Sequence, residues 1–250
     1  MLGSLKRLFS PSAPSAAPGP DLGAVLEWAQ RASRGFKRAR DGQGFVVDGR
    51  LDARPWRMEW GPSQRDYIVG HELRLRMELD LRSDMQMLLL GRNLMATLER
   101  QTYEQFTEST QTQIGNSTPE EMRWLVMFPQ VDLLTLPAVR SHFAAVASTP
   151  AAGLAWLEGP LAQALERARA TLLAGDPPFV LMILRNRAYL RVQMAQPQVD
   201  AVAMALDLFE TAVAQAQRSA ASHVDSTPEW NTTASSAWQS LKPDDAARRR

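Results

Sequence analysis

Residues 56–82 read WRMEWGPSQRDYIVGHELRLRMELDLR and decide the fold class of this chain. From Leu73 to Arg82 each apolar residue is followed by a charged one, and this period of two is typical of a β-strand with one buried and one solvated face. The same alternation, with two tryptophans, precedes a turn at residues 61–65. The segment therefore predicts a long antiparallel hairpin over about 56–82, with Val69 and His71 joining its apolar, inward face.

A second hairpin is predicted over about 179–194. Residues 179–184 are all apolar, which favours a central strand covered on both faces. After a turn at residues 185–187, apolar and polar residues alternate again as far as Met194, as in a strand with one exposed face. The two hairpins together predict a mainly antiparallel sheet.

Further strands are predicted at residues 45–47, 85–90 and 139–147. A single helix from Asp84 is the alternative for the second of these, and Gly91 within it disfavours that helix. Between the first of these and the 56–82 hairpin, two turns compete: Asp48-Gly49 has the residues of a two-residue hairpin turn, and Asp52-Ala53-Arg54-Pro55 has a proline. The sequence does not choose between them. The cations just upstream are typical of a solvated strand edge; they are Lys37, Arg38 and Arg40.

Amphipathic helices are predicted to pack against this sheet. A capping box at Thr118 to Glu121 begins one of them, which is expected to bury Met122, Leu125 and Val126, and the acidic pair Glu120 and Glu121 suits a helix N-terminus. Gly159-Pro160 should kink or split another helix. The predicted ranges are 21–34, 93–106, 118–128, 149–173 and 196–218, and the fold class is α+β.

The composition predicts one folded unit. The chain has 250 residues, 45% of them hydrophobic, enough for a sizeable core in a single α+β domain over about 21–220. Residues 1–20 are basic and then rich in Pro, Ala and Ser, and residues 221–250 are mostly polar, so both ends are predicted to be flexible. The last predicted helix packs in cis, although its apolar stripe could also serve a homodimer.

Several classes of chemistry find no support in the sequence. There is no cysteine, which excludes disulfides and thiolate metal sites, and the three histidines have no metal-ligand spacing. No glycine loop for phosphate and no nucleophile elbow are present. The expectation is therefore no cofactor, no metal and no enzymatic activity. Without a secretory signal or a long apolar run, the expected location is the cytoplasm, with peripheral contact at the inner membrane as an option.

The candidate contact residues lie mainly at the two ends. The N-terminus has the spacing of a short basic amphipathic helix that would touch a membrane surface or a partner; its residues are Leu2, Leu5, Lys6, Arg7, Leu8 and Phe9. Near the C-terminus, Trp230, Trp238 and Leu241 fall on one helical face that would dock in a partner groove. A possible anion contact combines the 61–65 turn with nearby arginines, namely Arg57, Arg65, Arg74 and Arg76.

These features favour a non-catalytic protein-interaction or scaffolding module that contacts its partners through flexible ends. The alternative is a small-molecule binder or enzyme with a pocket between sheet and helices. A third hypothesis is nucleic-acid binding, which the arginine-rich composition suggests and the net charge of only +1 disfavours.

Overall fold

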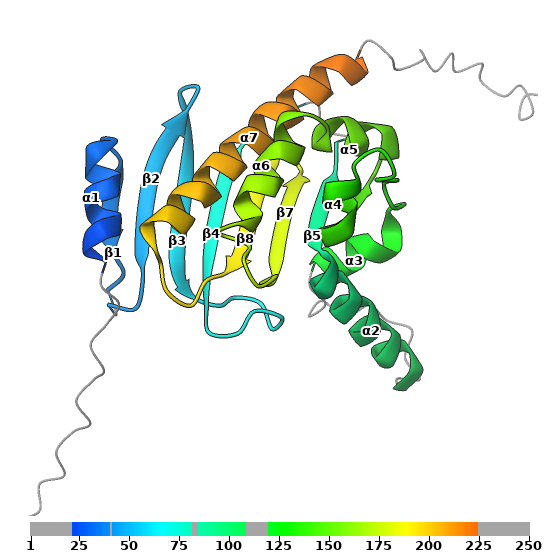
Figure 1. The fold of residues 1–250 in the computed structure, drawn as a ribbon, viewed down its shortest axis with the longest axis horizontal. Coiled ribbons are helices and arrows are strands. Elements are labelled where there is room, and N and C mark those ends of the chain that lie inside the picture. Colours follow the sequence, from blue (N-terminus) through cyan, green and yellow to red (C-terminus); the bar gives the residue numbers. More distant parts are fainter. Residues whose placement is uncertain (1–21, 41, 82–84, 109–119, 225–250) are drawn as a thin grey trace, which may run out of the picture.

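The computed structural model describes residues 22–40, 42–81, 85–108 and 120–224 (Figure 1). They form one eight-stranded, wholly antiparallel sheet in the order β1-β2-β3-β4-β8-β7-β5-β6. The strands are β1 (Gly35–Arg38), β2 (Phe45–Leu51), β3 (Arg54–Pro62), β4 (His71–Glu78), β5 (Met87–Gly91), β6 (Phe143–Ala147), β7 (Phe179–Leu184) and β8 (Arg187–Gln193). The predicted α+β class and both predicted hairpins are confirmed.

Seven helices of the described chain pack against this sheet. They are α1 (Gly23–Arg31), α2 (Arg92–Glu108), α3 (Glu120–Met127), α4 (Pro137–His142), α5 (Pro150–Leu157), α6 (Pro160–Arg169) and α7 (Val199–Val224). The predicted split at Gly159-Pro160 is confirmed, since it separates α5 from α6. Helix α7 runs six residues beyond the predicted end at Arg218 and remains buried on one side as far as Ala220. No helix in the described ranges is long and apolar enough to cross a membrane.

The sheet has two unequally covered faces. On the first face, α1 and α4 to α7 build the main core with the inward residues of all strands, including Trp56, Leu75, Leu181 and Phe209. On the second face, α2 and α3 cover only the β5, β6 and β7 end, through Leu98 and other side chains. Strand β7 therefore has a helix on each side, and all six of its residues are buried as predicted.

The second face of β2, β3, β4 and β8 has no helix over it within the described part of the chain. We call this region the open half. It carries the charged rows of the first hairpin and of β8, among them Arg57, Glu59, Glu72, Arg74, Arg76 and Arg191.

Several predicted boundaries were wrong for identifiable reasons. Strand β4 ends at Glu78 rather than Arg82, although Leu79 and Leu81 remain buried. The segment 139–147 is a short helix followed by a strand, because Pro137 starts α4 and β6 begins only at Phe143. In α3 the core side chain is Trp124, and Val126 is 60% exposed instead of buried.

The competition between the two turns is resolved in favour of residues 52–53. Asp52 and Ala53 both have positive φ, as the right-handed twist of a two-residue hairpin requires. Gly49 instead lies within β2, directly opposite Trp56. A Cβ at Gly49 would lie 2.2 Å from the indole ring, so the glycine makes room for the tryptophan.

We therefore expect Gly49→Ala to destabilise the protein by about 1–3 kcal/mol, because the buried Trp56 ring cannot move aside. Gly61→Ala is the matched control in the neighbouring strand, since its Cβ would meet no atom within 4 Å, and it should change stability by less than about 0.5 kcal/mol. Urea denaturation measures both. If both variants lost the same free energy of unfolding, contact with the Trp56 ring would not be the reason for glycine at position 49.

Candidate functional site

The most unusual feature of the structure is the loop between β3 and β4, residues 63–70, which lies at the end of the open half and reaches towards α3. The sequence predicted a tight turn at 61–65; the observed loop is longer and has its own internal hydrogen bonds. The Ser63 amide donates to the Gly70 carbonyl oxygen (2.9 Å), and the Ile68 amide donates to that of Arg65 (3.0 Å). Compact ordered loops of this kind are frequently functional.

A fully buried carboxylate, Glu72, ties the start of this loop to the sheet. Its Oε1 accepts hydrogen bonds from the Gln64 amide (3.0 Å) and from the guanidinium groups of Arg74 and Arg191 (2.9 Å each). The period-two pattern predicted Glu72 on a wet face. It is buried because the loop folds over that end of the second face, and two arginines compensate its charge.

The charge network continues across the open half. Glu59 accepts from Arg57 at 2.6 Å and from Arg74 at 3.2 Å. Burial raises the pKa of Glu59, but the hydrogen bond from Arg57 and the charges of Arg74, Arg57 and Arg76 outweigh it, so the pKa is lowered. Glu59 therefore stabilises the fold above its ordinary pKa and loses this contribution as the solution becomes more acidic.

A second fully buried carboxylate, Glu121, ties the middle of the loop to α3. It accepts a hydrogen bond from Arg65 Nε (3.2 Å) and another from the Tyr67 hydroxyl (3.0 Å). Burial, and then the neighbouring negative charge of Glu121, raise the pKa of Tyr67, which therefore stays protonated as the donor. The predicted place of Glu121 at a helix start is confirmed, since α3 begins at Glu120, but its hydrogen-bond partners come from a loop more than fifty residues away in sequence, which the sequence did not predict.

A third hydrogen bond fixes the end of the loop: the Val69 amide donates to Gln193 Oε1 in β8 (2.9 Å). The Val69 side chain itself is 79% exposed, so its predicted place in the core was wrong. His71, at the start of β4, is half-buried and stacks on Trp60 with ring centroids 4.6 Å apart, which agrees with its predicted place on the inward face. The loop thus presents an apolar side chain from a fixed backbone.

The four arginines proposed as an anion contact do not form a single cluster of free cations. Arg57, Arg65 and Arg74 are engaged by the carboxylates described above. Arg76 is exposed and has no ion pair within 4.0 Å among the described residues. It lines an open depression of about 460 Å³ together with Arg57, Arg187 and Tyr189. The other predicted contact residues, at positions 2–9 and 230–241, lie outside the described residues.

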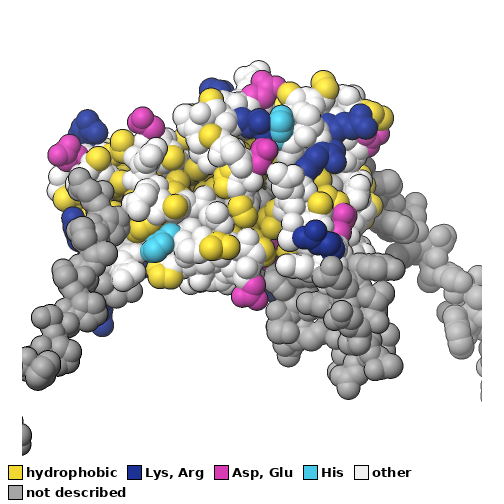
Figure 2. Space-filling view, turned by 60° about the horizontal axis from the view of Figure 1, so that its bottom comes forward, with side chains coloured by type: hydrophobic (Ala, Val, Ile, Leu, Met, Phe, Trp, Pro, Cys, Tyr) yellow, Lys and Arg dark blue, Asp and Glu magenta, His cyan; other side chains and the backbone are white. Residues whose placement is uncertain are grey.

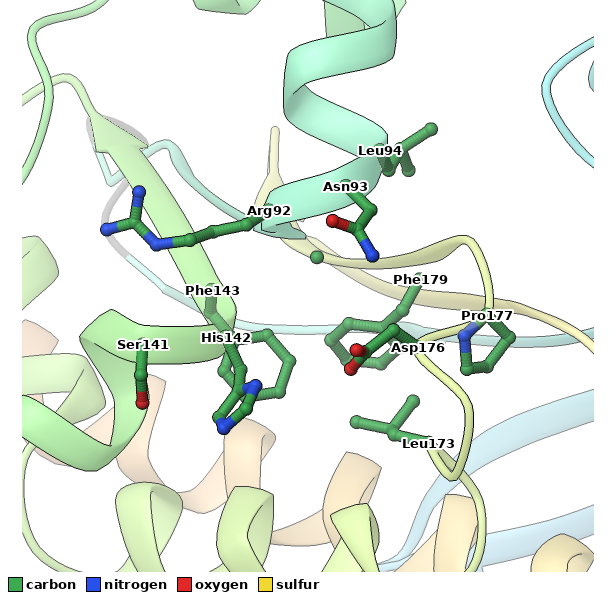
Figure 3. A pocket seen from close by; sticks show the side chains of 11 residues that line it. Arg92, Asn93, Leu94, Ser141, His142, Phe143, Leu173, Asp176, Pro177 and Phe179 are labelled. Atoms are coloured by element: carbon green, nitrogen blue, oxygen red, sulfur yellow. The ribbon is translucent and has the colours of Figure 1, made fainter.

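A small cavity at the start of α2 offers little room for chemistry (Figure 3). It encloses about 50 Å³ between Asn93, His142 and Asp176, with Phe143 and Phe179 beside them. Asp176 is paired with Arg169 at 3.0 Å. A volume of this size holds one or a few water molecules, whereas sites for metabolites span hundreds of cubic ångströms. Within the described ranges, no group of three or more His, Asp or Glu side chains could hold a metal ion.

The lower end of the molecule, turned forward in Figure 2, shows basic and acidic side chains scattered among apolar ones. Proteins that bind polyanions without sequence preference present a surface dominated by one sign of charge. The face shown in Figure 2 carries both signs of charge, with neither dominating.

Comparisons with known proteins add little. No protein-family model matches the chain, and no curated protein matches it. Among solved structures, it is similar to the crystal structure of the mycobacterial trehalose monomycolate transport factor A, TtfA, with a TM-score of 0.38 and 8% identity over 76% of this chain and 90% of that one. A likeness this weak carries no argument about function.

Proposed function

We propose that this chain is a non-catalytic protein-interaction module whose partner contacts the 63–70 loop and the adjoining open half of the sheet. One observation carries the proposal: two fully buried carboxylates, Glu72 and Glu121, hold this single loop in place. Buried ion pairs gain little net stability, because desolvation offsets their attraction, and their best-supported use is to specify one arrangement. A loop fixed in advance loses less entropy when it binds.

The exposed groups on this surface suit a protein partner. Val69 supplies an apolar contact at the loop, and the paired charges of β3 and β4 supply a polar surround, the usual anatomy of an interface. The charged side chains are already held by one another, so a partner need not order them.

Affinity purification of the tagged full chain from its native host, read by quantitative mass spectrometry, tests this function. Val69→Asp should abolish recovery of the partner, because it places a charge in an apolar contact while the side chain is too exposed to matter for folding. Val126→Asp is the matched control, an exposed valine on α3, and should retain the partner. If Val69→Asp recovers every protein that the native chain recovers, the proposal is wrong.

The predicted ends enter the same proposal as additional contacts. Trp230, Trp238 and Leu241 would dock in a groove of the partner, and residues 2–9 would add a weak contact to it or to a membrane surface. A chain lacking residues 1–20 and 225–250 tests this part, since the cut after Val224 leaves all of α7 intact. We expect reduced partner recovery, and unchanged recovery would remove the ends from the proposal.

A second candidate function is binding of a small anionic molecule in the depression beside Arg76. Three arginines and Tyr189 line it beside two carboxylates, Asp48 and Glu78, and Arg76 has no ion pair with a described residue. A rise in melting temperature with an anionic metabolite, absent in Arg76→Gln, would favour this function over the first.

A further inference from the structure

The two edge strands of the sheet, β6 and β1, differ in whether another segment of the described chain hydrogen-bonds to their outer side. At the β6 edge the segment 129–131 covers the strand: the Val131 amide donates to the Ala145 carbonyl oxygen (2.9 Å), and the Ala147 amide donates to that of Pro129 (3.2 Å). At the opposite edge, β1 pairs only with β2 among the described residues, and three of its four residues are exposed. As far as the described residues go, the β1 edge therefore has room for a further strand.

The backbone groups available at this edge follow from the register. Ala39 donates to the Gly44 carbonyl oxygen (2.9 Å), which places Ala39 among the residues that hydrogen-bond to β2. Because such residues alternate along an antiparallel strand, Lys37 also turns towards β2, and the amides and carbonyls of Phe36 and Arg38 point outward. An added strand would pair with these two residues.

The charge of the edge selects what can pair there. Residues 31–40 read RASRGFKRAR, with five cations and no acid. Arg31, Arg38 and Arg40 are exposed and have no ion pair with any described residue, and the contact of Lys37 with Asp48 is long, at 3.9 Å. A second copy of the chain would bring the same cations against them, so the edge opposes self-association, a known protection of edge strands.

We infer that β1 accepts an extended, acidic segment of a partner protein as a ninth strand. This inference rests on the proposed function, since it names one way in which an interaction module holds its partner. Lys37 lies on the second face and Arg38 on the first, so both faces of the incoming strand meet a cation. Phe36, half-buried and stacked on Phe45 at 5.7 Å, offers one apolar contact. Charges that repel a second copy thus attract this partner.

A labelled peptide of repeating Glu-Glu-Val-Val, which carries glutamates on both faces when it is extended, is titrated by fluorescence anisotropy against the full chain to test the inference. We expect saturable binding that weakens with salt. The double variant Lys37→Glu, Arg38→Glu should weaken binding by about tenfold or more, because two attractions become repulsions. Arg218→Glu, at an exposed position on α7, is the matched control and should bind as the native chain does.

A second pair of measurements separates strand addition from simple ion attraction. The same peptide with alternate amides N-methylated keeps its charge but loses its backbone donors, and it should bind about tenfold or more weakly. Arg38→Pro should bind more weakly than Arg38→Gln, because both variants lose the cation but only proline removes the outward amide. Melting curves of both variants confirm that the fold is intact.

Equal binding of the methylated and unmethylated peptides, or no binding of either, would overturn the inference. The proposed function fails separately. If a partner that depends on Val69 is recovered from the native host while the peptide does not bind, only the β1 inference is wrong.

Discussion

Glu72→Ala is expected to lower the free energy of unfolding by about 3–5 kcal/mol, because removing this buried carboxylate leaves Arg191 without an ion pair among the described residues and Arg74 with Glu59 alone. Both arginines are mostly buried, and the Nε of each already has no hydrogen-bond partner in the described structure. They cannot recover the loss by turning to solvent. Urea denaturation at neutral pH measures the change.

Glu78→Ala is the matched control. Glu78 lies six residues after Glu72 on the same face of β4, and its side chain is 77% exposed beside Arg187. It should cost less than about 1 kcal/mol. Hydrogen exchange adds a local readout: in Glu72→Ala the Gln64 amide, which donates to this carboxylate, should exchange faster. If both alanine variants cost the same, the buried network does not fix the loop.

Trp156→Ala is expected to cost about 3–5 kcal/mol, through the cavity left by a large, fully buried side chain. The indole lies between α5 and α7, and its Nε1–H donates to the Ala212 carbonyl oxygen at 3.0 Å. The variant therefore loosens the two helices from one another as well as opening a void.

Leu134→Ala serves as the control for Trp156, because Leu134 is an exposed apolar residue and its truncation should change stability by less than about 0.5 kcal/mol. Thermal unfolding followed by circular dichroism measures both variants. A Trp156→Ala protein as stable as the control would mean that the helix layer does not depend on this anchor.

The sequence predicted the strands and helices in which buried and exposed positions repeat with a regular period. Along β3, β4 and β8 the alternation of apolar and charged residues separates core from surface, and in β7 the unbroken apolar run reports helices on both faces. The 3,4 stripe of α7 likewise predicted burial in cis, and Val202, Leu206 and Phe209 are in the core.

The candidate site escaped prediction because its residues are distant in sequence. Glu72 and Arg191 meet only because β8 pairs with β4, and no periodicity reports strand order. Glu121 satisfied a local rule for helix starts, so its tertiary role was hidden. Pattern alone also placed Val69 inside, because the alternation of β4 continues into a loop that turns away from the sheet.

The strand order has a consequence for how the protein is made. The β7–β8 hairpin is inserted into the middle of the sheet, and the bond from Arg191 to Glu72 joins residues 119 positions apart. During synthesis from the N-terminus, β1 to β4 can form a meander by local pairing, but β4 must wait with an unpaired, apolar-faced edge until β8 leaves the ribosome. Such edges invite aggregation, and non-local pairing is slow. We therefore expect the nascent chain to depend on chaperones until its last third has emerged.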